Sequence, residues 1–335
     1  MKLPTAKLKE LTYASPNDPK IKRWLIGTIE SLSGREKFLP LYRYWRNHIV
    51  PKSPTIFCDM LDVIDCKLDL DAKVWPPRLE ANTPLVMIAN HPFGIGDGIS
   101  ILALAEQLGR PFKVIINNQL LRIPEVRPFS LPIDFDETRE AQVMNLKTRK
   151  EALALIAAGT TVVVFPAGGV ATAKTPFGRA ADLPWKLFTA KLIQSAKATV
   201  LPVYFEGQNG PLFHLVSRIS LTLRLSLLVS EFRKFEGSSP RIRIGDLVPF
   251  DQLKNPADRK ALTDELHDLV FALARPEEED LRRRKLRRVT NSAKRRVQGV
   301  GRLARQKMRR AGRLAKRKIL NPDAGSVNGD QPDGS

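Results

Sequence analysis

Short apolar runs alternate with longer amphipathic segments between residues 84 and 250 of this chain. Residues 85–89 are Leu-Val-Met-Ile-Ala, a continuous apolar run typical of a strand buried on both faces of a sheet. Similar runs predict strands at 113–116, 161–165, 200–205 and 241–244, and periodic apolar positions predict helices at 99–108, 146–158, 185–197 and 264–274. This alternation predicts an α/β domain in which helices flank a mostly parallel sheet.

Four regions follow from changes in the pattern. Residues 1–80 mix aromatic and basic positions and are expected to be helical, lying either at a bilayer interface or as a helical layer over the core. Residues 81–275 form the α/β domain. Residues 276–319 carry apolar residues at steps of three or four, which predicts a long amphipathic helix. Residues 320–335, rich in Gly, Asp, Pro and Ser, are expected to be disordered.

One apolar segment inside the domain has two interpretations. Residues 212–232 are interrupted by Arg218 and Arg224. The segment could lie in a membrane interface with its arginines reaching the head groups. A pair of core helices explains the same pattern equally well.

The positive charge lies mostly in the predicted C-terminal helix. The whole chain has a net charge of +20, and residues 281–319 contain 18 Lys and Arg with no Asp or Glu. Basic clusters bind anionic surfaces, each Lys or Arg contributing about 1 kcal/mol beside an anionic leaflet. We expect this helix to hold the protein on an anionic bilayer. A solvated basic helix is the alternative, and nucleic acid is less favoured as a partner because the apolar stripe is continuous.

The composition argues against several other classes of protein. No apolar stretch is long enough to span a membrane, and the first residues lack the apolar segment of a secretory signal. With only Cys58 and Cys66, a disulfide framework is not expected and a reducing cytosolic setting fits. The four histidines are scattered, so we predict no metal site.

His91 and Asp97 are the candidate catalytic residues. They lie in Ala-Asn-His-Pro-Phe-Gly-Ile-Gly-Asp-Gly, residues 89–98, directly after the first predicted strand of the sheet. This places them at the carboxyl edge, the usual position of a site in such sheets. A histidine can remove a hydroxyl proton near neutral pH, and a carboxylate on its other nitrogen fixes the tautomer. Alternatively, Asp97 only caps the helix that follows, since Asp is a preferred N-cap residue.

Three further loops are predicted at the same edge. The first contains Phe165, Pro166, Gly168 and Gly169, and the amides near the two glycines could hold an anionic head group or a developing oxyanion. The second follows the strand at 200–205. The third, after the strand at 113–116, contains two cations that could bind an anionic acceptor, namely Arg122 and Arg127.

These motifs together resemble the glycerophospholipid acyltransferase superfamily, the lysophosphatidic-acid-acyltransferase-like enzymes. The first motif is matched by residues 90–98, a Phe-Pro-Ala-Gly motif by residues 165–168, and a Pro-Val strand with a Gly-x-Asn turn by residues 202–209. Leu-Phe at 212–213 and Thr-Leu-Arg at 222–224 match downstream pieces. The similarity is greatest to the bacterial hemolysin-like branch, which includes the lyso-ornithine lipid O-acyltransferases, and it spans about residues 84–250.

Two departures from the superfamily pattern bear on the substrate. Five residues separate His91 from Asp97 where the superfamily usually has four, a spacing that this branch shares. The common Phe-Pro-Glu-Gly-Thr-Arg motif has Ala167 at its Glu, and Gly169 and Val170 in place of its Thr and Arg. In the superfamily that arginine is linked to an acceptor phosphate, so the resemblance implies a different acceptor. Lys174 and Arg179 could substitute as cations.

The resemblance implies an enzyme that moves an acyl group from acyl carrier protein or acyl-CoA to the hydroxyl of a lysolipid. His91 is then the base, Asp97 its partner, and no cofactor is needed. It also implies a peripheral protein on the cytoplasmic face of the inner membrane. The rival hypotheses are a non-catalytic basic protein that binds membrane or nucleic acid through residues 281–319, and a hydrolase. The chain lacks the Gly-x-Ser-x-Gly motif of a serine hydrolase.

Overall fold

The computed structural model describes residues 35–134, 138–217 and 221–274. The first 34 residues, the predicted basic helix at 276–319 and the predicted tail at 320–335 lie outside these ranges, so the expectations for them are not tested. Within the described ranges, no helix has both the length and the apolar character needed to cross a bilayer.

The described part of the chain contains a seven-stranded sheet with strand order β1-β9-β8-β2-β5-β3-β4. The strands of this sheet are β1 (Asp69–Asp71), β2 (Leu85–Ala89), β3 (Phe112–Asn117), β4 (Ser130–Ile133), β5 (Thr161–Val164), β8 (Thr199–Phe205) and β9 (Arg241–Ile244). Neighbouring strands from β8 to β4 are parallel, whereas β9 is antiparallel to β8. The predicted mostly parallel α/β fold is confirmed.

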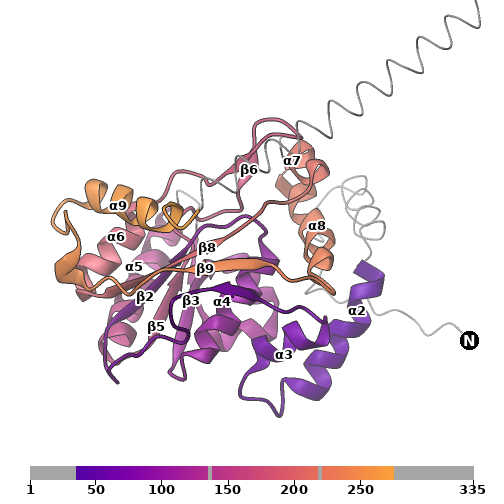
Figure 1. Cartoon of the computed structure of the whole chain (residues 1–335), viewed down its shortest axis with the longest axis horizontal. Coiled ribbons are helices and arrows are strands. Elements are labelled where there is room, and N and C mark those ends of the chain that lie inside the picture. Colours follow the sequence, from indigo (N-terminus) through magenta and orange to yellow (C-terminus); the bar gives the residue numbers. More distant parts are fainter. Residues whose placement is uncertain (1–34, 135–137, 218–220, 275–335) are drawn as a thin grey trace, which may run out of the picture. The chain divides into compact units, whose positions relative to one another are not determined.

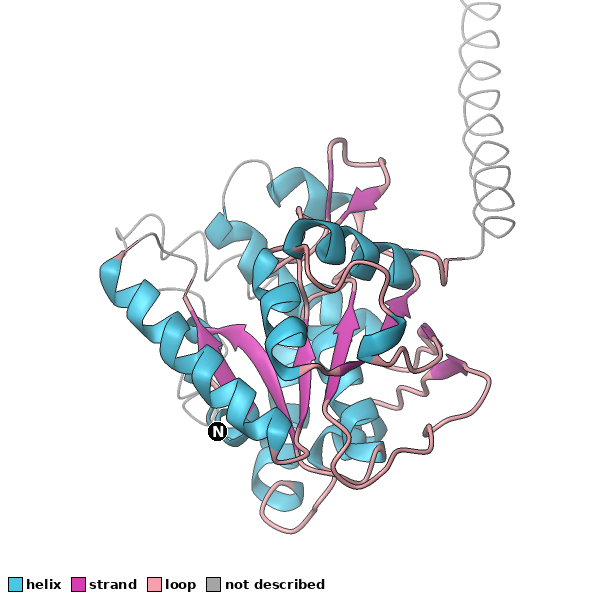
Figure 2. Cartoon of the chain, turned by 90° about the vertical axis from the view of Figure 1, so that its left-hand side faces the viewer, coloured by secondary structure: helices cyan, strands magenta, loops and turns pink. Residues whose placement is uncertain are grey.

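Helices cover both faces of this sheet (Figures 1 and 2). The α-helices are α2 (Arg35–Tyr44), α3 (Ile56–Val63), α4 (Ile95–Gln107), α5 (Arg139–Ala157), α6 (Leu187–Ala196), α7 (Pro211–Ser217), α8 (Leu221–Phe232) and α9 (Arg259–Phe271). Shorter turns of 3-10 or π helix are η2 (Trp45–Ile49), η3 (Asn118–Arg122), η4 (Pro124–Phe129), η5 (Arg233–Phe235) and η6 (Phe250–Gln252). A separate two-stranded hairpin pairs β6 (Thr172–Ala173) with β7 (Ala180–Ala181).

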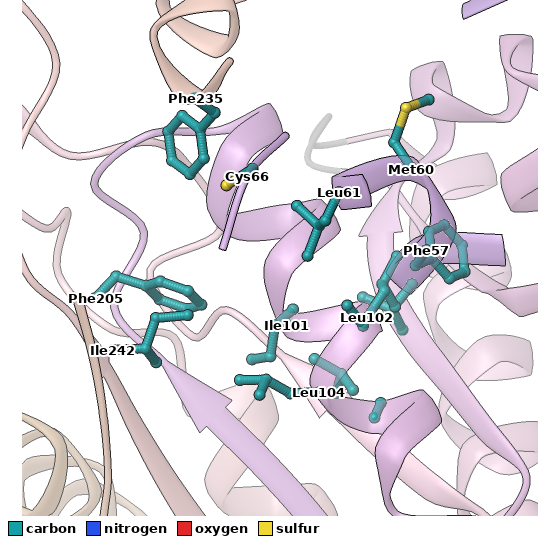
Figure 3. Close-up of a cluster of buried hydrophobic side chains, with 14 of the residues drawn as sticks. Phe57, Met60, Leu61, Cys66, Ile101, Leu102, Leu104, Phe205, Phe235 and Ile242 are labelled. Atoms are coloured by element: carbon teal, nitrogen blue, oxygen red, sulfur yellow. The ribbon is translucent and has the colours of Figure 1, made fainter. Parts of the chain in front are cut away.

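The two faces of the sheet carry separate hydrophobic clusters, because successive strand residues point to opposite faces. In β2, Leu85 and Met87 join a cluster with residues of α2, α3, α4 and α8, part of which is drawn in Figure 3. Val86 and Ile88 join the other cluster, with residues of α5, α6 and α9. Every residue of β2 is fully buried, which explains its continuous apolar sequence.

The structure resolves two of the open alternatives for segments near the core. Phe38, Tyr42 and Trp45 are buried in the first cluster, so this part of residues 1–80 is a helical layer over the core. Residues 212–232 form α7 and α8, whose inner faces bury Phe213 and Phe232. A pair of core helices accounts for these buried faces, while Leu212 and Leu215 of α7 remain exposed.

Several elements begin earlier than predicted. α4 begins at Ile95 instead of residue 99, and α5 at Arg139 instead of residue 146. In α5 the side chain of Thr138 accepts a hydrogen bond from the Ala141 amide, a cap that the apolar pattern does not reveal. The strands β1 and β4 were not predicted, because each is short and only partly apolar.

Candidate active site

The candidate site lies where β2 ends, between the neighbouring strands β8 and β5. Asn90 follows β2, and its side chain bonds twice to the backbone of Phe205 at the end of β8: Nδ2 donates to the carbonyl at 2.9 Å, and Oδ1 accepts from the amide at 2.7 Å. This reciprocal pair fixes the direction in which the chain leaves β2. His91 is therefore presented from a rigid edge of the sheet.

His91 and Asp97 meet across the loop. Nδ1 of His91 lies 3.0 Å from Oδ1 of Asp97, and the two side chains are 17% and 0% exposed. The two atoms are close but poorly aligned for a hydrogen bond, as catalytic contacts often are before substrate binds. Since Nδ1 faces the carboxylate, Nε2 is the ring nitrogen left to exchange a proton with a substrate.

Asp97 is not the N-cap residue of the helix that follows. α4 begins two residues before it, with Gly94 at the N-cap position and a φ angle of +82°. Asp97 lies in the first turn, and its Oδ2 accepts a hydrogen bond of 2.8 Å from the Phe93 amide. The capping interpretation is therefore wrong: the carboxylate holds the loop with one oxygen and faces His91 with the other.

Two glycines of this loop allow close packing. A Cβ atom on Gly96 would lie 2.3 Å from the ring of Phe235, and one on Gly94 would lie 2.8 Å from Leu228. Gly98 differs, because nothing lies within 4 Å of where its Cβ would be. Gly207, after β8, leaves room for the ring of Phe93, which a Cβ would approach to 2.6 Å. The motif at residues 90–98 and the Pro-Val motif at residues 202–209 are thus in direct contact.

The loop after β5 packs against the histidine. The ring of Phe165 stacks on the imidazole of His91 with a centroid distance of 4.1 Å and an interplanar angle of 28°. The carbonyl of His91 accepts a hydrogen bond of 2.7 Å from the Ala171 amide, and the Pro166 carbonyl accepts one from Lys186. Phe165 therefore covers one face of the imidazole, and Asp97 lies beside its Nδ1 atom.

The amides of the glycine-rich turn are not all available. Gly168 has a φ angle of +67°, which favours glycine, and its amide donates to the Phe165 carbonyl at 2.9 Å. The expectation that Gly168 could donate to an oxyanion is corrected, because that amide is used to close the turn. Gly169, whose Cβ position would lie 3.1 Å from Leu183, stays a predicted donor.

Asp182 is a residue that the sequence did not single out. Its Oδ1 accepts a hydrogen bond of 3.2 Å from the His91 amide, and its Oδ2 accepts one of 3.1 Å from the indole of Trp185. Burial raises the pKa of this carboxyl, although the hydrogen bonds from Trp185 and His91 oppose the effect. A single Asp between two loop segments gives no sequence signal. Only the folded chain brings it to His91, 91 positions away.

The predicted cations lie in different places. Lys174 and Arg179 are exposed on the hairpin that follows the Phe165 loop, and Arg179 lines a small pocket beside Asn90 and Asp182.

Arg127 lies just before β4, which is parallel to β3, so it is near the amino edge of the sheet and away from His91. Its Nε donates to the Leu121 carbonyl. The expectation that Arg127 joins the site is therefore wrong. Arg122 ends η3, and its side chain is not described.

No group of acidic, cysteine or histidine side chains suited to a metal ion occurs among the described residues. At the site itself, the structure places an imidazole beside a buried carboxylate. Such a pair can accept a proton from a hydroxyl group while that hydroxyl attacks an acyl carbon.

Comparisons with known proteins place this geometry in context. A family model described as "Acyltransferase" matches residues 75–261, which include the site and most of the sheet. Among solved structures, the chain is similar to the 1-acyl-sn-glycerophosphate (LPA) acyltransferase PlsC from Thermotoga maritima. The identity is 15% and the TM-score 0.43, over 75% of this chain and 94% of that one. No curated protein sequence matches.

Proposed function

Because the chain belongs to this acyltransferase family, we propose that it transfers a fatty acyl group from a thioester to the hydroxyl of a lysolipid. The observation that carries the proposal is the contact of His91 with the buried Asp97 at 3.0 Å. A buried carboxylate in this position fixes the imidazole tautomer and stabilises the imidazolium that forms when the ring accepts a proton. The proposed donor is acyl carrier protein or acyl-CoA, and no cofactor takes part.

The proposed reaction follows from the orientation of the imidazole. Nε2 of His91 accepts the proton of the acceptor hydroxyl as the hydroxyl oxygen attacks the thioester carbonyl. The carbonyl oxygen becomes an oxyanion, for which the Gly169 amide is the candidate hydrogen-bond donor. Collapse of this intermediate forms the ester and breaks the carbon–sulfur bond. The imidazolium then protonates the departing thiolate.

The residues in and after the Phe-Pro-Ala-Gly motif support an acceptor other than a glycerol phosphate. Ala167 and Val170, both buried, occupy the positions where the common motif has its Glu and Arg. No cation is therefore supplied by the turn itself. We propose a lysolipid with a different head group, a lyso-ornithine lipid being the first to test. The proposed place of reaction is the cytoplasmic face of the inner membrane, with the protein bound peripherally.

The test is acyl transfer by purified protein to a panel of lysolipids, with acyl carrier protein and CoA thioesters as donors. We expect His91→Ala to reduce transfer at least a thousandfold without loss of folded structure. His48→Ala is the matched control, because the ring of His48 contacts that of the exposed Tyr44 at a tilt. We expect acyl transfer by this variant to be unchanged. Near-normal transfer by His91→Ala to the accepted lysolipid would refute the mechanism. Lipid mass spectrometry of cells with and without the gene would identify the acceptor as the lysolipid that accumulates.

A further inference from the structure

The exposed large apolar side chains of this protein are concentrated on one edge of the sheet. Among the residues whose burial is described, nine such side chains are exposed. Seven of them lie on segments that leave the carboxyl ends of the parallel strands: Val143, Leu146, Phe177, Leu183, Leu187, Leu212 and Leu215. Single exposed apolar residues are normal on any surface, but a gathering on one edge marks an interaction surface.

This edge is also the one that carries His91. β2, β5, β8 and β4 are linked by parallel pairing, so their carboxyl ends lie together. Val143 and Leu146 flank Asn145, which hydrogen-bonds in both directions with Asp134 at the end of β4. Leu187 opens α6, and Leu212 and Leu215 lie one turn apart on α7. Val74, by contrast, follows β1, which runs opposite to β2 and ends at the other edge.

Phe177 is the most exposed of these side chains, at 82%. It lies at the tip of the hairpin formed by β6 and β7, in a turn closed by a hydrogen bond of 3.0 Å from the Gly178 amide to the Thr175 carbonyl. Pro176 occupies the second position of this turn, where its fixed φ angle is favoured. The turn therefore presents Phe177 to solvent in a preset conformation.

The base of the hairpin is fixed to the active site and to α7. Ala171, just before β6, donates to the His91 carbonyl, and the Ala173 amide donates to Nδ1 of the buried His214 at 3.3 Å. On the other strand, Gln208 bonds to the Ala180 amide and to the Gly178 carbonyl. α7 contacts β6, and Figure 1 shows the two side by side. Because its base is held to His91, a hairpin whose tip binds a surface also places His91 at a set distance from that surface.

From these observations we propose that this edge, with Phe177 as its anchor, docks on a lipid bilayer. Lys174 and Arg179 are exposed on either side of Phe177 in the sequence. Their positive charge is complementary to an anionic lipid surface, and long cationic side chains can reach head groups beside an apolar anchor. The pocket lined by Asn90 and Asp182 has a volume of about 50 Å³, whereas small-molecule sites occupy about 300–1,000 Å³. Docking leaves the chain of a lysolipid in the bilayer and brings its hydroxyl to His91. This last step rests on the proposed function, but the docking itself does not.

The test places a fluorophore at the tip of the hairpin in the full chain. Phe177→Cys carries a thiol-reactive, environment-sensitive dye, and Val74→Cys, at a position 66% exposed on the other edge, is the matched control. The native thiols react slowly, because burial raises the pKa of Cys58 to about 11 and also raises the pKa of Cys66. Phosphatidylcholine vesicles in high salt suppress binding through the basic C-terminal residues.

The expected result is a blue shift of the dye at position 177, with quenching by nitroxide-labelled lipids, and no change at position 74. We also expect Phe177→Ser to weaken vesicle partition about tenfold, which corresponds to about 1.4 kcal/mol, and Val74→Ser to leave it unchanged. A dye at 177 that stays in water, or equal changes at both positions, would overturn the proposal.

Activity separates this proposal from the proposed function. Phe177→Ser should retain acyl transfer to detergent-dispersed lysolipid and lose about tenfold on vesicles, whereas His91→Ala should insert like the wild type. Insertion without transfer to any lysolipid by the wild type would refute the function and leave docking in place. Transfer on vesicles that does not depend on Phe177 would refute the docking.

Discussion

Two loops leave the same edge of the sheet and are built in opposite ways. The loop after β2 and the first turn of α4, residues 90–97, are mostly buried. Their polar groups hydrogen-bond to one another and to β8. The segment after β5, residues 165–186, begins with Phe165 against His91 but then extends into a hairpin with an exposed phenylalanine at its tip. The first loop holds two side chains in a fixed geometry. The second links that geometry to the surface of the molecule.

This difference shows which changes should affect chemistry and which should affect stability or docking. Changes in the first loop alter the position or tautomer of His91, or the packing that supports it. Changes at the contacts between the two segments alter how well the imidazole is held. Changes where β6 contacts His214 of α7 should mainly alter the stability of the hairpin.

The largest effect is expected from Asp97→Asn. The asparagine can still accept from the Phe93 amide, but its NH₂ group then faces Nδ1 of His91 and favours the wrong tautomer. We expect acyl transfer to fall about a thousandfold while the fold is kept, as removal of the carboxylate does in catalytic triads. Initial rates and thermal unfolding of the purified variant provide the measurement. A variant with more than a tenth of the normal rate would contradict the role of Asp97.

Gly96→Ala tests the packing that supports the first loop. The added methyl group would meet the ring of Phe235, so we expect a loss of about 1–3 kcal/mol in the free energy of unfolding. Gly98→Ala is the matched control, since it adds the same group where nothing lies within 4 Å and should stabilise α4 by up to about 1 kcal/mol. Urea denaturation of both variants makes the comparison. Equal effects would mean that the Phe235 contact does not constrain the loop.

Asp182→Asn tests the connection between the two segments. Asparagine has only one acceptor oxygen, so either the His91 amide or the Trp185 indole loses its hydrogen bond. We expect kcat to fall about tenfold with KM little changed, because a small misplacement of a catalytic group is costly. Trp185 fluorescence should also change. An unchanged kcat with altered fluorescence would show that Asp182 supports the fold but not the position of His91.

The smallest effect is a pH dependence at the hairpin base. Burial lowers the pKa of His214 below its ordinary value of 6.5. The unfolded chain therefore binds more protons than the folded one just below that pH, and stability from this residue falls as the solution is acidified. A protonated His214 also cannot accept from the Ala173 amide. Urea midpoints between about pH 5 and 7 should fall less for His214→Gln than for the wild type. Parallel curves would contradict this.

The sequence by itself determined the fold class and the central strands. β2 and β9 have the predicted bounds. β2 is buried on both faces and is therefore apolar at every position, whereas β9 is recognised by its two isoleucines alternating with arginines. It also determined that His91 and Asp97 lie on one loop at the carboxyl edge. The spacing alone did not separate a catalytic carboxylate from a helix cap, since both roles use the same residue type.

Only the tertiary structure decided what surrounds that pair. Asp182 reaches the His91 amide through a contact between residues far apart in the chain, and such a contact leaves no periodic pattern. Two local details also went unpredicted: the short helical turns η3 and η4 carry Arg127 to the far edge, and the Gly168 amide donates to the Phe165 carbonyl within its own turn. The placement of seven exposed apolar side chains at the carboxyl edge also depends on the parallel order of the strands. Local sequence determines which elements form, but long-range packing determines which of their side chains meet.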